Sequence, residues 1–174
     1  MTDTRSFAIR KAFLIPLGLL LLLSVSLFAV CLVQGEPTGK VVILGVIILP
    51  VAVLFVESAF RRAEVSDRGV TVFKFLRQGA LSFDAMTSVD TVQVRKRAFL
   101  TLSAGEDFLI LSNAYADFPG LVNALLARVP QETVSEETQK MAAAPPVKST
   151  DIVSCWLAVA LMGLILYIQL GGKI

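Results

Sequence analysis

The chain has 174 residues, of which 55% are hydrophobic and 17% charged, and this balance is too apolar for a purely soluble globule. Its net charge of +2 does not supply the basic face that a nucleic-acid-binding protein needs. Histidine is absent, which removes the most common general base and the most common transition-metal ligand. We therefore expect no nucleic acid, metal ion or cofactor as a ligand.

Three predominantly apolar stretches predict transmembrane helices at residues 12–33, 41–60 and 151–170. Each is close to the roughly 20 residues that cross the hydrocarbon core of a bilayer as a helix. The first stretch follows several basic residues and could instead be a signal peptide. Its apolar region is longer than signal peptides usually have, so we expect a retained helix.

The distribution of basic residues predicts how the chain is oriented. Residues 1–11 contain three Lys or Arg and the section 61–150 contains eleven, whereas the hairpin 34–40 and the tail 171–174 contain one each. Because basic residues favour the cytoplasmic side, the N-terminus and residues 61–150 are predicted to be cytoplasmic, with the hairpin and the C-terminus external. The expected location is a bacterial cytoplasmic (inner) membrane. With this orientation the two cysteines lie near opposite membrane faces and form no disulfide.

Residues 61–130 show the pattern of short strands followed by one helix. Turn signals such as "SDRG" and "AGE" separate runs rich in β-branched and aromatic residues. Gly69 is expected to supply positive φ in the first turn, and Gly105 is expected to lie in the loop of a hairpin. A helix is predicted to begin near Asp117 and Pro119. Its apolar stripe is Phe118, Leu121, Val122, Leu125, Leu126 and Val129. Residues 131–150 are polar and rich in Ala and Pro, and we expect a flexible linker.

The segments "DRGVTVF", "LSFDAM", "SVDTV" and "LVNALLARV", in this order, resemble the bacterial pleckstrin-homology-like domain. Phe83 and Met86 occupy the apolar positions of the family's central turn, and the resemblance covers about residues 60–130. It implies a membrane α+β protein in which a transmembrane hairpin leads into a small β-barrel or curled sheet, capped by a C-terminal amphipathic helix. The third transmembrane helix departs from the simplest form of this arrangement.

No catalytic motif is present, since the chain has neither a G-x-S-x-G nor a P-loop sequence. The carboxylates are scattered through predicted turns, where such residues commonly cap or solvate the chain. We therefore expect no enzymatic activity.

Two groups of residues are candidate contact sites. The basic residues near the predicted membrane surface could contact anionic lipid headgroups or form solvated turns. They are Arg61, Arg62, Arg95, Lys96 and Arg97. The strand residues Phe108, Leu109, Ile110 and Leu111 are apolar on both faces, although a half-exposed strand should alternate. Either a larger local core, a protein partner or the bilayer surface must cover the second face.

These patterns favour a non-enzymatic membrane adaptor or assembly subunit that presents a protein-interaction domain at the cytoplasmic surface. Its expected partners are the bilayer and either another membrane protein or a second copy of the chain. One alternative is an accessory subunit of a transporter or a small channel-like component, although Gln169 and Glu57 are the only polar residues that suggest it. Another alternative is a sensor of anionic lipid.

Overall fold

A computed structural model describes residues 4–146 and 149–171 of the chain. The described residues divide into two compact units. The β-rich unit contains residues 4–10 and 60–146, and the helical unit contains residues 11–59 and 149–171. The chain passes between them at three points: after Arg10, before Phe60 and beyond Pro146.

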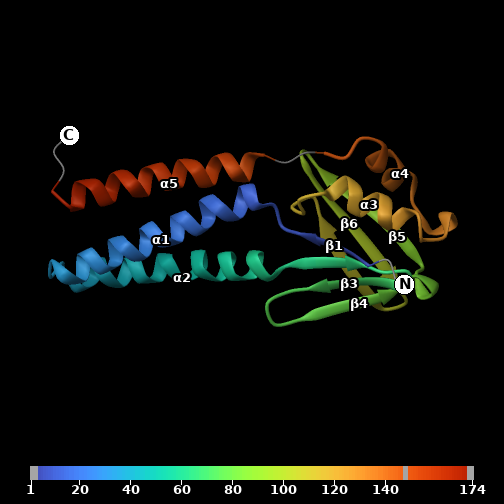
Figure 1. Ribbon diagram of the computed structural model, residues 1–174, viewed down its shortest axis with the longest axis horizontal. Helices are drawn as coiled ribbons and strands as arrows, with labels where there is room; N and C mark the ends of the chain where they lie inside the picture. Colours follow the sequence, from blue (N-terminus) through green and yellow to red (C-terminus); the bar gives the residue numbers. More distant parts are fainter. Residues whose placement is uncertain (1–3, 147–148, 172–174) are drawn as a thin grey trace. The chain divides into compact units, whose positions relative to one another are not determined.

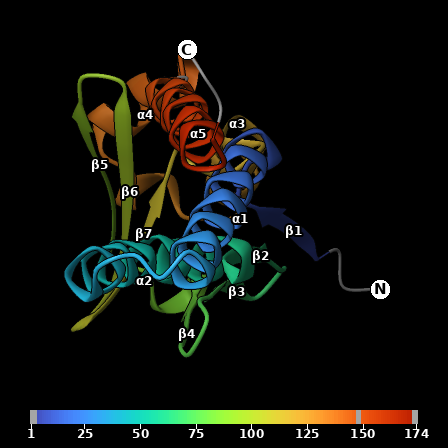
Figure 2. The same cartoon turned by 90° about the vertical axis from the view of Figure 1, so that its left-hand side faces the viewer.

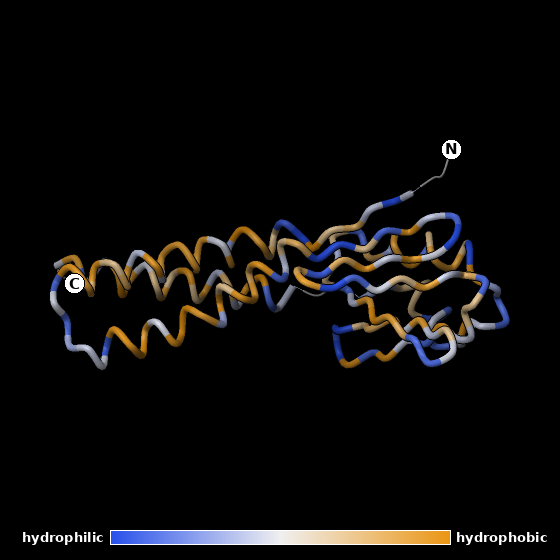
Figure 3. Tube along the Cα trace, turned by 90° about the horizontal axis from the view of Figure 1, so that it is seen from below, coloured by the Kyte–Doolittle hydropathy of each residue, from blue (hydrophilic) through white to orange (hydrophobic). Residues whose placement is uncertain are grey.

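The helical unit consists of three long helices, each apolar and long enough to cross a membrane. They are α1 (Lys11–Val33), α2 (Thr38–Phe60) and α5 (Thr150–Gln169). Figure 3 shows hydrophobic residues along all three, with hydrophilic ones mainly near the helix ends. The three predicted stretches are confirmed, and α2 begins three residues earlier than the predicted residue 41. The features agree with a multi-pass membrane protein.

Within the helical unit, α1 and α5 pack along each other. They run in the same direction, because Gln169 at the end of α5 donates a hydrogen bond to Gln34 just beyond the end of α1. The hydroxyls of Ser24 and Ser26 donate to carbonyl oxygens four residues earlier in α1, at 2.8 and 2.9 Å. These two bonds satisfy the hydroxyls within α1, so neither hydroxyl needs a polar partner on another helix.

The β-rich unit contains two antiparallel sheets (Figure 1). The first has the order β1-β2-β3-β4, and the second has the order β5-β6-β7. The strands are β1 (Arg5–Ala8), β2 (Arg62–Val65), β3 (Gly69–Phe73), β4 (Gln78–Ser82), β5 (Ser88–Val94), β6 (Arg97–Ala104) and β7 (Asp107–Ser112). The strands predicted between residues 61 and 112 are therefore present, and β5 and β6 form a long hairpin (Figure 2).

Of the two expected forms, a small β-barrel or a curled sheet, the closed barrel is not found among the described residues. Strand β4 lies against β6 and β7, but no strand of one sheet pairs with a strand of the other within the described residues. The chain leaves β4 through a short 3-10 helix, η1 (Phe83–Ala85), in which the amide of Phe83 donates to the carbonyl of Arg68. Phe83 and Met86 are both buried there. Because this turn redirects the chain, β5 begins a second sheet instead of pairing with β4.

Helix α3 (Phe118–Leu126) supplies much of the core. The Asp117 carboxylate caps it by accepting from the amide of Gly120 at 2.9 Å, and Pro119 lies in the first turn, as the sequence predicts. The predicted apolar stripe is buried except for Leu126, which is half-buried. The opposite position, Asn123, is exposed.

Strand β1 was not predicted, because residues 1–11 were expected to be only a cytoplasmic N-terminus. Arg5–Ala8 pairs with β2, and Phe7 and Ile9 are buried. The N-terminal segment therefore completes the first sheet, although more than fifty residues separate the two strands in the sequence.

The expected linker 131–150 contains regular structure. A 3-10 helix, η2 (Gln131–Thr133), precedes α4 (Glu136–Ala143). The buried Thr138 hydroxyl lies 3.0 Å from the carbonyl oxygen of Val89 and 2.9 Å from the hydroxyl of Thr91, so α4 is fastened to β5. A domain that ended at residue 130 would lack this layer.

The two turn glycines have different roles. Gly105 lies in the β6–β7 turn, as predicted, and has φ of +63° there. Gly69 is not among the residues with positive φ, so that expectation was wrong. A Cβ atom on Gly69 would overlap the carbonyl oxygen of Leu81, and glycine is needed there because β3 and β4 approach closely.

Candidate functional site

The second sheet carries an apolar surface on the side away from the core. Val92, Val94, Phe108 and Ile110 are exposed there, and Phe99 is half-buried. The strand register makes them neighbours, because Val92 lies opposite Phe99, and Ile110 lies opposite the residue two positions after Phe99. Side chains two apart on a strand share a face, so these five residues form one patch, the outer apolar face.

The first sheet shows what a solvated outer face looks like in the same unit. Its strands β2 and β3 alternate buried aliphatic residues with outward residues such as Arg62, Glu64 and Thr71. Arg62 pairs with Glu64 at 3.2 Å and lies over the ring of Phe73 at 4.5 Å. Water can cover this polar face, whereas it solvates the outer apolar face of the second sheet poorly.

The four residues of the predicted partner face, Phe108–Leu111, differ in exposure. Phe108 is 64% exposed and Ile110 is 42% exposed, so both are open to a partner. Leu111 is fully buried, and Leu109 is half-buried with its side chain next to Gly79 of β4. Leu111 therefore belongs to the core and cannot contact a partner, while Val92 and Val94 take part in the exposed surface that the sequence pattern did not indicate.

The basic turn at residues 95–97 joins β5 to β6 beside the outer apolar face. The buried amide of Asn113 donates to the carbonyl oxygens of Lys96 and Pro146, at 2.8 Å each. Pro146 lies just before the chain continues into the helical unit. Asn113 thus holds the basic turn near one of the three points where the chain leaves the β-rich unit. Sequence reasoning missed this residue, since an isolated Asn carries no signal.

The other two exits, after Arg10 and before Phe60, lie close to the same segment, residues 113–115. The amide of Arg10 donates to the carbonyl of Ala114 at 3.3 Å, and the Arg10 Nε donates to the carbonyl of Tyr115 at 3.2 Å. Ala8 lies opposite Arg62 in the sheet, so the chain that leaves towards α1 runs beside the chain that arrives from α2. All three exits are therefore at one end of the β-rich unit, which we call the exit end.

Tyr115 is a buried polar residue at the exit end. Burial raises the pKa of its phenol, and the positive charge of Arg61 offsets part of this effect. Neither the Tyr115 hydroxyl nor the Arg61 Nε has a hydrogen-bond partner of good geometry within the described part of the chain. Arg61 is thus half-buried against the tyrosine, and only part of its side chain remains open to a headgroup.

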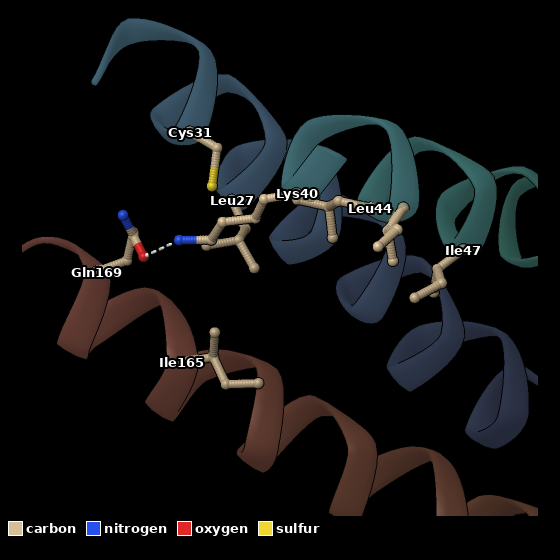
Figure 4. Close-up of a pocket in the computed structure, with 8 residues that line it drawn as sticks. Leu27, Cys31, Lys40, Leu44, Ile47, Ile165 and Gln169 are labelled. Carbon is tan, nitrogen blue, oxygen red and sulfur yellow. Dashed lines mark hydrogen bonds between the residues drawn. The ribbon is translucent and has the colours of Figure 1, made fainter. Parts of the chain in front are cut away.

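The helical unit contains a groove of about 430 Å³ between its helices (Figure 4). Its lining is apolar except at one end, where Lys40 and Gln169 form a polar cluster with the neighbouring Glu36. The Lys40 ammonium lies 2.9 Å from the Glu36 carboxylate and donates to the Gln169 side chain at 3.0 Å. Both interactions lower the pKa of Glu36 below its ordinary value. Because Lys40 is already paired, the groove offers apolar volume and no uncompensated charge for an anionic ligand. The residues that line it are Leu27, Cys31, Lys40, Ile43, Leu44, Ile47, Ile165 and Gln169.

The described residues contain few candidate metal ligands or nucleophiles that lie together. No group of three or more Cys, Asp or Glu side chains there could hold a metal ion. Cys31 and Cys155 are both free thiols in the helical unit.

Comparisons of the sequence with protein-family models, curated proteins and solved structures gave no match.

Proposed function

We propose that the chain is a non-enzymatic membrane adaptor, or an assembly subunit, whose β-rich unit docks another membrane protein or a second copy of the chain. The outer apolar face is the observation that carries this proposal. The same unit has a polar outer face on its first sheet, so an exposed apolar surface is not a general property of its sheets. Exposed, contiguous apolar side chains are typical of sites that contact another protein or a membrane.

The proposed arrangement places the β-rich unit on the cytoplasmic side of a bacterial inner membrane, with the tail after α5 outside. The excess of basic residues in residues 1–11 and 61–150 supports this orientation. We also propose that the unit is a pleckstrin-homology-like domain. Support comes from its order of antiparallel hairpins followed by α3 and from the buried Phe83 and Met86 in the central turn.

Site-specific photo-crosslinking of the full chain in native membranes tests the docking surface. A photoreactive amino acid at Phe108 should give a discrete protein adduct, and the same group at Thr71, on the polar outer face, should not. Ile110→Ser combined with Val92→Ser should remove the Phe108 adduct while the protein remains folded. Equal crosslinking at both positions, or none at Phe108, would contradict the proposal.

An anionic-lipid sensor is the second candidate, because the basic turn 95–97 lies beside Pro146 at the exit end. Charge reversal of Arg95, Lys96 and Arg97 separates the two functions. If the chain is an adaptor, the Phe108 adduct persists in this variant. If lipid binding dominates, the adduct is lost and selective binding to anionic vesicles is lost with it.

A further inference from the structure

The turn between β3 and β4 has an unusual composition for a solvated hairpin. Residues 74–77 read K-F-L-R, and the amide of Lys74 donates to the carbonyl of Arg77 at 2.8 Å to close the turn. Such turns usually contain Gly, Asn, Asp, Pro or Ser. Here Leu76 is 83% exposed and Phe75 is 51% exposed. Two large apolar side chains thus lie at an exposed tip between two exposed basic residues.

The register of the first sheet fixes where this tip lies. Ala8, Arg62, Phe73 and Gln78 are successive neighbours across β1, β2, β3 and β4. Ala8 leads to α1, and Arg62 follows α2. Residues 74–77 extend beyond this row at the same edge of the sheet, so the tip lies at the exit end.

A contact between two aromatic rings places the tip beside the end of α2. The rings of Phe75 and Phe60 are 5.4 Å apart between centroids and tilted by 52°. Phe60 is the last residue of α2, a helix apolar and long enough to cross a membrane. Phe75 is therefore level with the point at which the chain leaves this helix. Where α2 enters a bilayer, that level is the boundary between headgroups and acyl chains.

We propose that the tip at residues 74–77 is an interfacial membrane anchor. Phe75 and Leu76 insert at the level of the upper acyl chains, and Lys74 and Arg77 contact the phosphates of anionic headgroups. This division matches the side chains, because long basic residues extend towards headgroups while aromatic and aliphatic residues enter the apolar layer. The anchor depends on α2 spanning the bilayer, and it is independent of the protein-docking face on the second sheet.

Depth-dependent fluorescence quenching in vesicles tests the anchor. The full chain, with Cys31 and Cys155 replaced by Ala, carries one cysteine with an environment-sensitive dye, in phosphatidylcholine vesicles with or without phosphatidylglycerol. The dye at Leu76→Cys should be blue-shifted and quenched by lipids with a spin label near the headgroup. The matched control is Asp67→Cys in the β2–β3 turn, at the opposite end of the same sheet, where the dye should remain unquenched. A dye at Ile47→Cys, in the middle of α2, must be quenched by deeply labelled lipids; if it is not, α2 does not span and the anchor is refuted with its premise.

Charge variants test the role of the basic residues. Lys74→Glu and Arg77→Glu should each lower the anionic-lipid-dependent part of the Leu76 quenching about fivefold. The quenching in pure phosphatidylcholine should change less. Persistence of the anionic-lipid effect in the double variant would overturn the headgroup contacts. Equal quenching at Leu76 and Asp67 would overturn the anchor, as would a blue shift at Leu76 without lipid quenching, which would indicate a protein contact.

Discussion

The N-terminal strand should be essential for the stability of the β-rich unit. Because Ala8 lies opposite Arg62, residues 4–10 can be joined to residues 60–146 by a short Gly/Ser linker that replaces α1 and α2. In the linked protein, β1 and β2 form a hairpin. Removing residues 4–10 exposes the edge of β2 and takes two buried side chains, Phe7 and Ile9, out of the core.

The expected loss of stability follows from this burial. Each of the two side chains contributes about 1.5–3 kcal/mol when fully buried, so the segment contributes about 3–6 kcal/mol. Domains of this size are stable by only about 5–15 kcal/mol, so residues 60–146 alone should be marginally folded. With a urea dependence of about 1–3 kcal/mol per molar, the midpoint should fall by about 2 M.

Urea denaturation followed by circular dichroism measures this difference. In the linked protein, Phe7→Ala should lower the midpoint clearly, since such truncations of buried Phe cost about 3–5 kcal/mol. Ser6→Ala, an exposed position on the same strand, is the matched control and should change stability by less than about 0.5 kcal/mol. If residues 60–146 unfold at the same urea concentration as the linked protein, β1 does not belong to the core and the reasoning is wrong.

Three further changes test single contacts. Tyr115→Phe should leave the β-rich unit as stable or raise its stability by about 1 kcal/mol, because it removes a buried hydroxyl without a good partner in the described structure; a large loss in urea denaturation would show that the hydroxyl is bonded. Gly69→Ala should destabilise by about 2–4 kcal/mol because its Cβ meets the backbone of Leu81. Gly105→Ala has open space around it and should cost only about 1–2 kcal/mol for its positive φ. Equal losses would contradict the close approach of β3 and β4 at Gly69. Because the folded pKa of Glu36 is lowered, its ionised form contributes stability to the helical unit above the ordinary pKa of 4.5, and this stability is lost as pH falls through the lower folded value. Glu36→Gln should therefore abolish this acid-dependent change in the thermal melting temperature in detergent.

The local pattern of the sequence predicts the elements whose contacts are near in the chain. Turn residues and alternating apolar residues predict the hairpins, and the 3.6-residue spacing that includes Leu121 and Leu125 predicts α3. Length and apolar composition are enough to find α1, α2 and α5. In all of these elements the stabilising contacts follow from spacing within one segment.

The missed elements depend on partners far away in the sequence. Strand β1 is four residues long and lies directly before an apolar helix, so its pattern is too short to recognise. Helix α4 is mostly polar, and its inward side chains are only Thr138 and Met141. Thr138 is placed by hydrogen bonds to β5, which composition cannot reveal. The outer apolar face has the same origin, because Val92 becomes a neighbour of Phe99 only through the register of two strands.

The three chain exits also affect how strongly each surface must bind. They lie together around residues 113–115, so three backbone connections leave the β-rich unit at one end, where a single flexible tether would give only one. The tip at residues 74–77 and the basic turn at residues 95–97 lie at the same end of the β-rich unit as these exits. A binding partner in the same membrane then meets the outer apolar face at a high effective concentration, and weak intrinsic contacts suffice. On the adaptor proposal, a face of a few exposed apolar residues is therefore adequate for assembly in the membrane, and the isolated unit should bind the same partner only weakly in solution.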